Sequence, residues 1–232
     1  MSLDTVMLGN EPRSDAEAPL PPSSYRITRV QTEEELRTWR LVRQNVYLEE
    51  GLFTEDDVDE PVYTDRYDDY SEHFLAWDHA GAPVATARLI FGSEQHARPL
   101  QVESAFDVTP EPDSAEISGF AVVREHRAGL AQVGLMRALF ERLHELGIEH
   151  CYAEVEPWFF KALTRFGYPV TRISESQFVF NAENFVIYMR LEDFWEGARA
   201  DIAEKKRSIR GTYYSHPWDG TIGRKHLVYR DR

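Results

Sequence analysis

A strand that turns directly into a helix, in residues 116–143, is the feature that most constrains the fold of this chain. GFAVV has the apolar content of a buried strand, and the apolar residues after the turn recur with helical spacing. Between them lie Arg124, His126 and Arg127, followed by Gly129. The first turn of a helix has unpaired N–H groups and the positive end of the helix dipole. We therefore predict an anion site here, which Gly129 leaves open because it has no Cβ.

The surrounding patterns predict one α/β domain, with a mixed sheet covered by helices on both faces. The expected order is strand, helix, hairpin, strand, helix, strand, helix, strand pair and late helix. The hairpin should turn at residues 79–83, and residues 98–114 should form a long connection. We expect a disordered leader at 1–24, the domain at 25–195, and a C-terminal helix and extension at 196–232.

Capping residues predict where the helices begin and end. Thr32 and Glu35 mark the start of the first helix, and Gly51 marks its end. Pro157 marks the first turn of a later helix that stops at Gly167. The helix over residues 129–146 should bury an apolar stripe made of Leu130, Val133, Met136, Leu139, Leu143 and Leu146.

The charge of the chain is acidic and unevenly spread. The net charge is -14, and residues 1–120 alone hold 9 Lys/Arg against 25 Asp/Glu. No part is strongly basic, which argues against nucleic acid as the main partner. The absence of a long apolar run or of a secretion signal predicts no integral membrane association. The single cysteine, Cys151, fits a reducing cytoplasm and is expected to be a small buried residue rather than a nucleophile.

Two protein families place a phosphate group at such a turn. GLAQVG fits the G-x-A-x-x-G pattern of dinucleotide-binding folds, with Glu154 beyond the next strand as the ribose-binding acid. That fold continues as repeated β-α-β units, whereas a hairpin precedes the turn here. A third alternative is an ordinary strand–helix turn that binds nothing.

HRAGLA resembles the Q/R-x-x-G-x-G/A signature of the acetyl-coenzyme A-dependent N-acetyltransferases, the GNAT superfamily. Gly129 and Ala131 match, while His126 stands at the Gln/Arg position beside Arg127. FFKALTRFGY resembles the late helix of that superfamily, but the usual general-acid Tyr falls on Leu163, which leaves the acid unassigned. The resemblance implies a mostly antiparallel sheet and a donor site made of Phe120, Val122, Arg124, His126, Arg127, Ala128, Gly129, Leu130 and Ala131.

Charged residues in the first half form a second pattern. Trp39, Arg43 and Tyr47 are four residues apart and share one helix face. An arginine on an apolar face needs a partner, and DRYDDY offers Asp65 and Asp68. Arg88 lies in another half-buried strand, and Glu116 opens the central strand.

This set resembles the acyl-homoserine-lactone synthases, and more closely the long-chain N-acyl amino acid synthases and exosortase-associated acyltransferases. The resemblance covers about residues 25–190. It implies catalytic roles for Glu116, Arg43, Arg88, Asp65 and Asp68, and substrate contacts from Phe106, Ser118, Gly119, Trp39 and Tyr47. The alternative is a purely structural ion network.

The chain departs from that pattern at Gly119, where the family usually has the arginine of Glu-x-x-Arg. The change removes a charge and predicts open space for a different amine or a bulkier acyl chain. It argues against lactone synthesis from S-adenosylmethionine.

The resemblance predicts transfer of an acyl group from acyl-coenzyme A or acyl-carrier protein to a small amine, without a metal. Glu116 is the expected base, and the backbone N–H groups of residues 120–122 are expected to polarise the thioester carbonyl. Arg137 and Arg142 lie off the apolar stripe and are expected to dock an acidic carrier. A short-chain acetyltransferase and an inactive thioester-binding protein remain alternatives.

Overall fold

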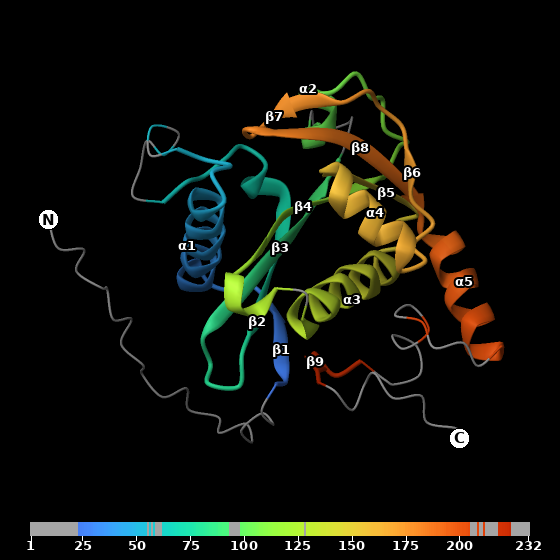
Figure 1. The fold of residues 1–232 in the computed structure, drawn as a ribbon, viewed down its shortest axis with the longest axis horizontal. Helices are drawn as coiled ribbons and strands as arrows, with labels where there is room; N and C mark the ends of the chain where they lie inside the picture. The colour runs from blue at the N-terminus through green and yellow to red at the C-terminus, as the bar shows by residue number, and fades with distance from the viewer. Residues whose placement is uncertain are drawn as a thin grey trace, which may run out of the picture.

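The computed structural model describes residues 23–54, 56, 58, 62–92, 98–127, 129–204, 208, 211 and 218–223. Within them, nine strands form one mixed sheet with five α-helices around it (Figure 1). The elements are β1 (Tyr25–Arg29), α1 (Glu33–Glu49), η2 (Asp68–Tyr70), β2 (Ser71–Trp77), β3 (Pro83–Phe91), α2 (Gln101–Ala105), β4 (Ala115–Val122), η4 (Arg124–His126), α3 (Leu130–Glu145), β5 (His150–Val155), α4 (Pro157–Arg165), β6 (Thr171–Arg172), β7 (Gln177–Val179), β8 (Ala182–Arg190), α5 (Leu191–Ala203) and β9 (Thr221–Ile222).

The sheet has the strand order β6-β8-β5-β4-β3-β2-β1-β9, and β7 pairs with β8. Among the described residues, the only parallel pairing joins β4 to β5, and every other pairing is antiparallel. The predicted mixed, mostly antiparallel sheet is therefore confirmed. Its single parallel step lies at the centre, between two antiparallel halves.

The predicted helix ends are confirmed for α1. Thr32 Oγ1 accepts the Glu35 N–H at 3.2 Å, and Glu35 Oε2 accepts the Gln31 N–H at 2.8 Å. These bonds satisfy two backbone donors at the start of the chain's first helix. Gly51 follows the helix with φ +70, a conformation in which glycine is favoured.

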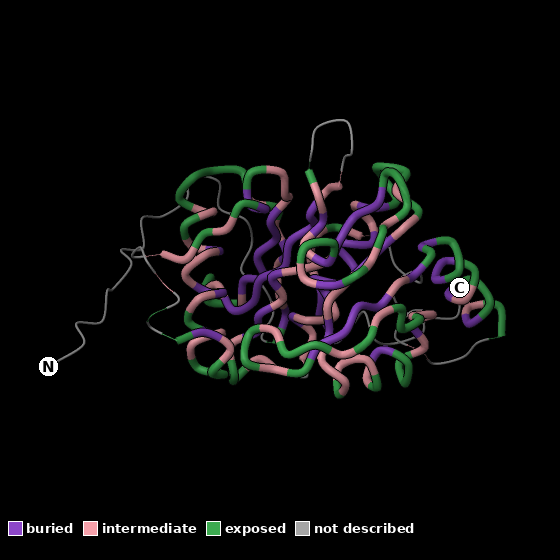
Figure 2. The backbone as a smooth tube through the Cα atoms, turned by 90° about the horizontal axis from the view of Figure 1, so that it is seen from above, coloured by how far each residue is buried: buried purple, intermediate pink, exposed green. Residues whose placement is uncertain are grey.

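Helices α3, α4 and α5 pack on one face of the sheet, and α1 and α2 lie on the other. Figure 2 shows the buried backbone running along the strands, with exposed residues on the outer helix faces and loops. Part of the apolar stripe predicted for α3 is wrong, because Leu146 is 43% exposed. Phe140 instead packs on Phe194 of α5, with ring centroids 4.6 Å apart. The buried face is rotated accordingly and consists of Ala131, Gly134, Leu135, Met136, Arg137, Ala138, Leu139, Phe140 and Leu143.

Three segments differ from the expected organisation or lie beyond it. The connection expected over residues 98–114 contains α2, a five-residue helix. Helix α5 spans the expected boundary at residue 195. Strand β9, in the expected C-terminal extension, pairs with β1, so this part of the extension packs on the domain. Most of the expected leader, residues 1–22, lies outside the described residues.

Candidate active site

Four of the predicted charged residues form one ion cluster on the α1 side of the sheet. Arg88 on β3 donates from Nη1 to Asp65 Oδ1 at 2.8 Å and to Asp68 Oδ1 at 2.7 Å. Arg43 on α1 donates from Nη1 to Asp65 Oδ2 at 3.3 Å. The two arginines are 2% and 1% exposed, so their charges depend on these carboxylates. The structure thus brings together residues from α1, β3 and the segment before β2.

Two further residues that sequence analysis did not identify complete this ion cluster around Asp68. Arg40 Nε donates to Asp68 Oδ2 at 3.1 Å, and His73 Nε2 lies 3.2 Å from Asp68 Oδ1. Burial alone would raise the pKa of Asp68, but the His73 bond and the charges of Arg43 and Arg88 hold it well below its usual range. Burial lowers the pKa of His73, so a neutral ring donates this bond. Counting across the hairpin would have found His73, because it is the register partner of Arg88.

Trp39 is fully buried beside this cluster and fills the space next to Gly119. Its ring centroid lies 4.4 Å from the Arg43 guanidinium carbon, and its Nε1 donates to the carbonyl of Ala87 at 3.0 Å. A Cβ on Gly119 would lie 2.8 Å from Trp39 Cζ2, and the φ of Gly119 is +60. The expectation that Gly119 opens room for a bulkier substrate is therefore wrong, because an indole ring already occupies that room.

Glu116 lies below the first turn of α2 and outside the ion cluster. Its side chain is fully buried, and Oε2 accepts the Val102 N–H at 3.0 Å. Burial raises the pKa of Glu116 to about 8, against the opposing effects of the backbone N–H bonds and of Arg88. The carboxyl is consequently protonated at neutral pH and anchors α2 to the central strand.

Gln101, at the start of α2, connects the ion cluster to the two central strands. Its Oε1 accepts Arg88 Nη2 at 3.0 Å and Ser118 Oγ at 3.3 Å. Its side chain also bonds to Glu154 on β5, a carboxyl whose pKa burial raises to about 7. Gln101 was missed from the sequence, because a lone Gln in an expected loop gives no signal.

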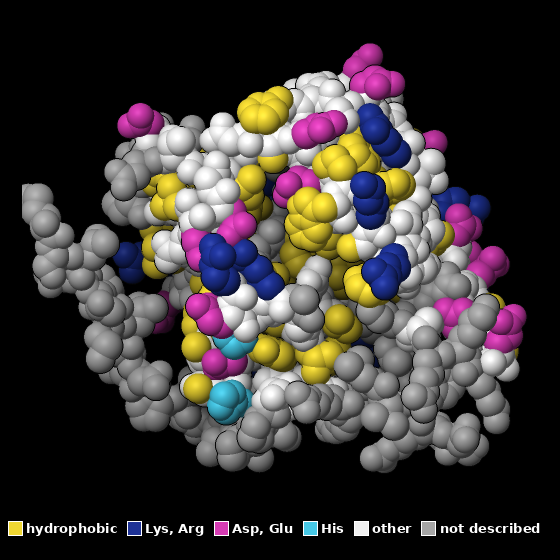
Figure 3. All heavy atoms as spheres, viewed as in Figure 1, with side chains coloured by type: hydrophobic (Ala, Val, Ile, Leu, Met, Phe, Trp, Pro, Cys, Tyr) yellow, Lys and Arg dark blue, Asp and Glu magenta, His cyan; other side chains and the backbone are white. Residues whose placement is uncertain are grey.

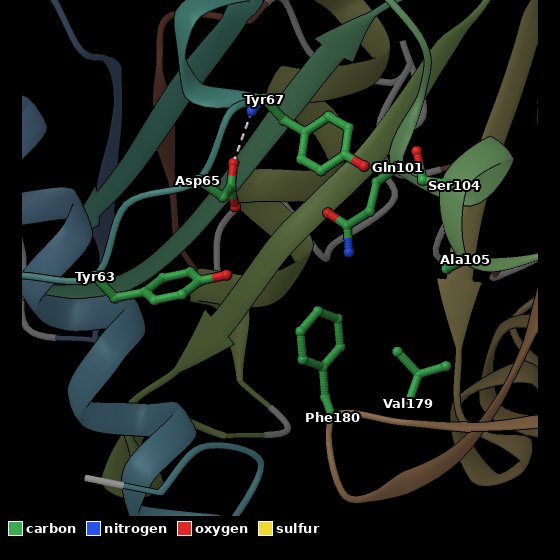
Figure 4. A pocket seen from close by; sticks show the side chains of 8 residues that line it. All are labelled: Tyr63, Asp65, Tyr67, Gln101, Ser104, Ala105, Val179 and Phe180. Atoms are coloured by element: carbon green, nitrogen blue, oxygen red, sulfur yellow. Dashed lines mark hydrogen bonds between the residues drawn. The ribbon is translucent and has the colours of Figure 1, made fainter. Parts of the chain in front are cut away.

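A pocket of about 190 Å³ lies beside Gln101 and Asp65. It is lined by side chains from the segment before β2, from α2 and from β7 and the β7–β8 turn. Figure 4 shows the Gln101 amide and the rings of Tyr63 and Phe180 pointing into it. Its lining residues are Tyr63, Asp65, Tyr67, Gln101, Ser104, Ala105, Val179 and Phe180. An ion cluster at one wall and apolar groups at the others suit a molecule with a polar head and an apolar part.

The two central strands separate beside this pocket. β4 and β5 pair only at Ala115 with Cys151 and at Glu116 with Tyr152, although both strands continue. The register of β4 with β3 also shifts near Gly119, where the backbone has positive φ. The facing edges beyond these pairs have no strand-to-strand bonds, and helices α3 and α4 begin at that end of the sheet.

The turn between β4 and α3 holds its basic residues against acidic partners. Arg124 bonds to Glu49 and Glu50 at the end of α1, and Arg127 Nη1 donates to Glu50 Oε1 at 2.7 Å. Surface pairs of this kind are weak, so an anion can displace them. His126 is instead directed at Tyr25 on β1, with 3.0 Å between Nδ1 and the hydroxyl.

Gly129 is the N-cap of α3, which has no side-chain cap and no acidic residue in its first turn. A Cβ at residue 129 would lie 2.9 Å from the carbonyl oxygen of His126. Glycine is therefore required by the turn itself, whether or not a ligand approaches. Leu130 and the buried Ala131 begin the helix, and Ala128 lies outside the described residues.

The other predicted donor and substrate residues have separate positions. Phe106 belongs to the buried cluster under α2, and Tyr47 stacks edge-on against Phe53. Phe120 lies on the α3 face of the sheet, 6.2 Å from Phe159 of α4 between ring centroids. Val122 is buried, and its carbonyl accepts Arg127 Nε.

The predicted carrier-docking pair is wrong for Arg137, which is buried against Trp218 with its guanidinium carbon 4.8 Å from the ring centroid. Arg142 donates to both oxygens of Glu72, at 2.8 and 2.7 Å, and bonds to Glu145. The packing of α3 against β1 and β2 explains both positions. Neither side chain belongs to a free basic surface.

Cys151 is buried and free, and burial raises its pKa to about 12, which excludes a thiolate nucleophile at neutral pH. In the part of the chain that the structure describes, no group of three or more His, Cys, Asp and Glu side chains could hold a metal ion. The described helices include none that is long and apolar enough to cross a membrane.

Residues 42–152 match the family model of an acetyltransferase (GNAT) domain, and a search of curated proteins found no match. The solved structure of BjaI, a CoA-dependent acyl-homoserine lactone synthase with MTA, is 22% identical with TM-score 0.60, covering 80% of this chain and 92% of that chain. FeeM, an N-acyl amino acid synthase from uncultured soil microbes, is 14% identical with TM-score 0.58, covering 75% and 93%. The AHL synthase LasI is 18% identical with TM-score 0.59, covering 74% and 91%. At these identities the likeness shows a shared fold.

Proposed function

We propose that this chain, which carries a GNAT acetyltransferase domain, transfers an acyl group from a phosphopantetheine thioester to an amine such as an amino acid. The observation that carries the proposal is the separation of β4 from β5 after two residue pairs, beside a pocket with an ion cluster. An extended amide-containing arm fits between two strand edges, because each edge offers hydrogen-bonding groups.

The unpaired edges of β4 and β5 define an opening in the sheet, and α3 begins at its end. The residues at this end support an anionic thioester as the donor. Helix α3 begins there without a capping side chain, and its N–H groups favour a phosphate. Arg124 and Arg127 are close in the same turn, and their guanidinium groups pair with surface acids. The donor is therefore either acyl-coenzyme A or acyl-carrier protein, which carry the same pantetheine arm.

The pocket side supports an amine acceptor with an apolar part. Asp65 is a pocket residue that both buried arginines hold in place, so its carboxylate is positioned to orient a polar group. The solved relative FeeM is an N-acyl amino acid synthase, which makes amino acids the first acceptors to test.

The test is mass spectrometry of reactions that contain the purified chain, one acyl donor and an equimolar mixture of amino acids. Acetyl-, isopentyl- and decanoyl-coenzyme A are compared with the same acyl groups on acyl-carrier protein. An N-acyl amino acid from the longer donors supports the proposal. Product from acetyl-coenzyme A alone would make the chain a short-chain acetyltransferase, and binding without any product would make it a thioester-binding protein.

A further inference from the structure

The pairing of β5 with β4 ends at Tyr152. On the side of the sheet that carries α2, Glu154 is the next residue of β5, and no residue of β4 pairs with it. The last pair joins Glu116 to Tyr152, so the parallel register places Glu154 across the opening from Ser118. Side chains alternate along a strand, and Glu154 therefore shares its face with Tyr152 and with the α2 side of the sheet.

Gln101 connects Ser118 on β4 to Glu154 on β5 through its side chain. Its Oε1 accepts hydrogen bonds from Arg88 and from Ser118, which leaves its amide NH₂ as the donor to Glu154. Gln101 also lines the pocket (Figure 4), so the Glu154 carboxyl is one hydrogen bond away from a pocket-lining side chain.

One carboxylate oxygen of Glu154 remains available. Oε2 is buried and has no hydrogen-bond partner among the described residues. A buried polar atom without a partner is costly, and native structures keep few of them without a function. The residue as a whole is only partly buried, in contrast to the fully buried Glu116.

We propose that Glu154, rather than Glu116, takes the proton of the attacking amine, with Gln101 holding its carboxylate in place. This inference rests on the proposed function. Glu116 also has one oxygen without a partner, Oε1, but its side chain is fully enclosed, whereas Glu154 is only partly buried. Backbone N–H groups of Gln101 and Val102 bond to Glu116, so its role is to position Gln101.

The ammonium form of the acceptor gives one proton to the Glu154 carboxylate, directly or through one water, and the neutral nitrogen attacks the thioester carbon. The C–S bond breaks with its electron pair on sulfur, and a second nitrogen-bound proton reaches the thiolate. Glu154 then returns its proton to solvent.

The groups around Glu154 agree with a base that works near neutral pH. Tyr47 on α1 and Glu116 on β4 are the titratable groups that it influences, and β8 places Val186 opposite. Burial raises the pKa of Glu154 to about 7, and the Gln101 bond limits that rise. The carboxylate form accumulates above this pH, so the rate should rise through pH 7.

The test uses isopentyl-coenzyme A and the amino acid that the mass-spectrometry screen identifies. Glu154→Gln should lower kcat about a hundredfold and leave the KM for the donor within twofold. It should also remove the acidic limb of the pH profile, which is the fall in kcat below about pH 7. Glu149→Gln, an exposed carboxyl just before β5, is the matched control and should keep both rate and profile. Gln101→Leu should move the limb to higher pH, because it removes the bond that favours the carboxylate.

A Glu154→Gln variant with kcat within threefold of the parent and the same limb would overturn the inference while leaving the proposed function intact. If that variant does not fold, Glu154→Asp replaces it, and a retained limb with reduced kcat supports the proposal. If the parent acylates no amine, the proposed function fails first. Carbon-13 NMR of the labelled glutamate carboxyls then decides independently, since a Glu154 midpoint below pH 5.5 contradicts the base role and one near 7 supports it.

Discussion

The indole of Trp39 lies so close to Gly119 that a Cβ there would be 2.8 Å from Cζ2. The contact explains why β4 has a glycine at residue 119, near the positions where its register with β3 shifts and beyond its last pair with β5. Trp39 in turn packs on Arg43, so the buried ion cluster depends on the same contact.

Gly119→Ala should be clearly more destabilising than a glycine replacement that only strains the backbone. Gly147→Ala is the matched control, because Gly147 has φ +68 and nothing within 4 Å of its Cβ position. Strain in the left-handed conformation costs about 1–2 kcal/mol in both variants. Gly119→Ala should lose roughly 1–3 kcal/mol more through overpacking against Trp39. Urea unfolding measures the difference. Equal losses in the free energy of unfolding for the two variants would show that Trp39 moves aside without cost.

The free energy of unfolding should fall as pH rises from about 4.5 to 8. The folded pKa of Glu116 is about 8 and its ordinary value is 4.5, so the folded state holds more protons over this range and loses stability as they leave. Glu116→Gln resembles the protonated form, so its free energy of unfolding should depend less on pH. The decrease between pH 4.5 and 8 should be smaller than in the parent by roughly a few kcal/mol. Glu149→Gln should leave the slope unchanged, and an unaltered slope in Glu116→Gln would mean that its carboxyl ionises normally.

Removing an acid at the end of α1 that pairs with the β4–α3 turn should strengthen donor binding. Glu50 pairs with Arg124 and Arg127, so Glu50→Gln removes one of the two acids that compete with phosphate for these guanidinium groups and leaves Glu49 as the other. Surface pairs contribute up to about 1 kcal/mol, which predicts a two- to fivefold lower Kd for coenzyme A by calorimetry. Glu33→Gln makes the same charge change at the other end of α1 and serves as the control. Weaker or equal binding in Glu50→Gln would remove these arginines from the donor site.

If an acyl-carrier protein brings the donor, it should dock on α4 rather than on α3. Lys161 and Arg165 are exposed on α4 next to Trp158, which is 62% exposed. Figure 3 shows basic and apolar side chains together over this helix. Reversing both charges to Glu should lower the rate with acyl-carrier protein about tenfold in a salt-dependent way and keep the rate with acyl-coenzyme A. Arg37→Glu, on the opposite face, is the control. Equal loss with both donors would assign these residues to coenzyme A instead.

Local chemistry explains which parts of the fold were predictable. Caps such as Thr32 and Pro157 act within one helical turn, and buried charges such as Arg43 and Arg88 must find carboxylates, so both could be inferred from residue types. The inner face of α3 could not, because Phe194 lies more than fifty residues away and decides which side is covered. Gln101 and Glu154 meet only through the three-dimensional path of α2 and β5, which leaves no spacing in the chain to recognise.

The two-pair contact between β4 and β5 also has a consequence for stability if the proposed donor lies between these strands. A ligand that lies between the strand edges and bonds to both completes the sheet, and its binding free energy adds directly to the stability of the fold. The amount of folded protein would then follow the level of acyl donor, and starvation for donor would expose the chain to unfolding and proteolysis. The two-pair contact between β4 and β5 would in this way make the stability of the fold depend on the bound donor.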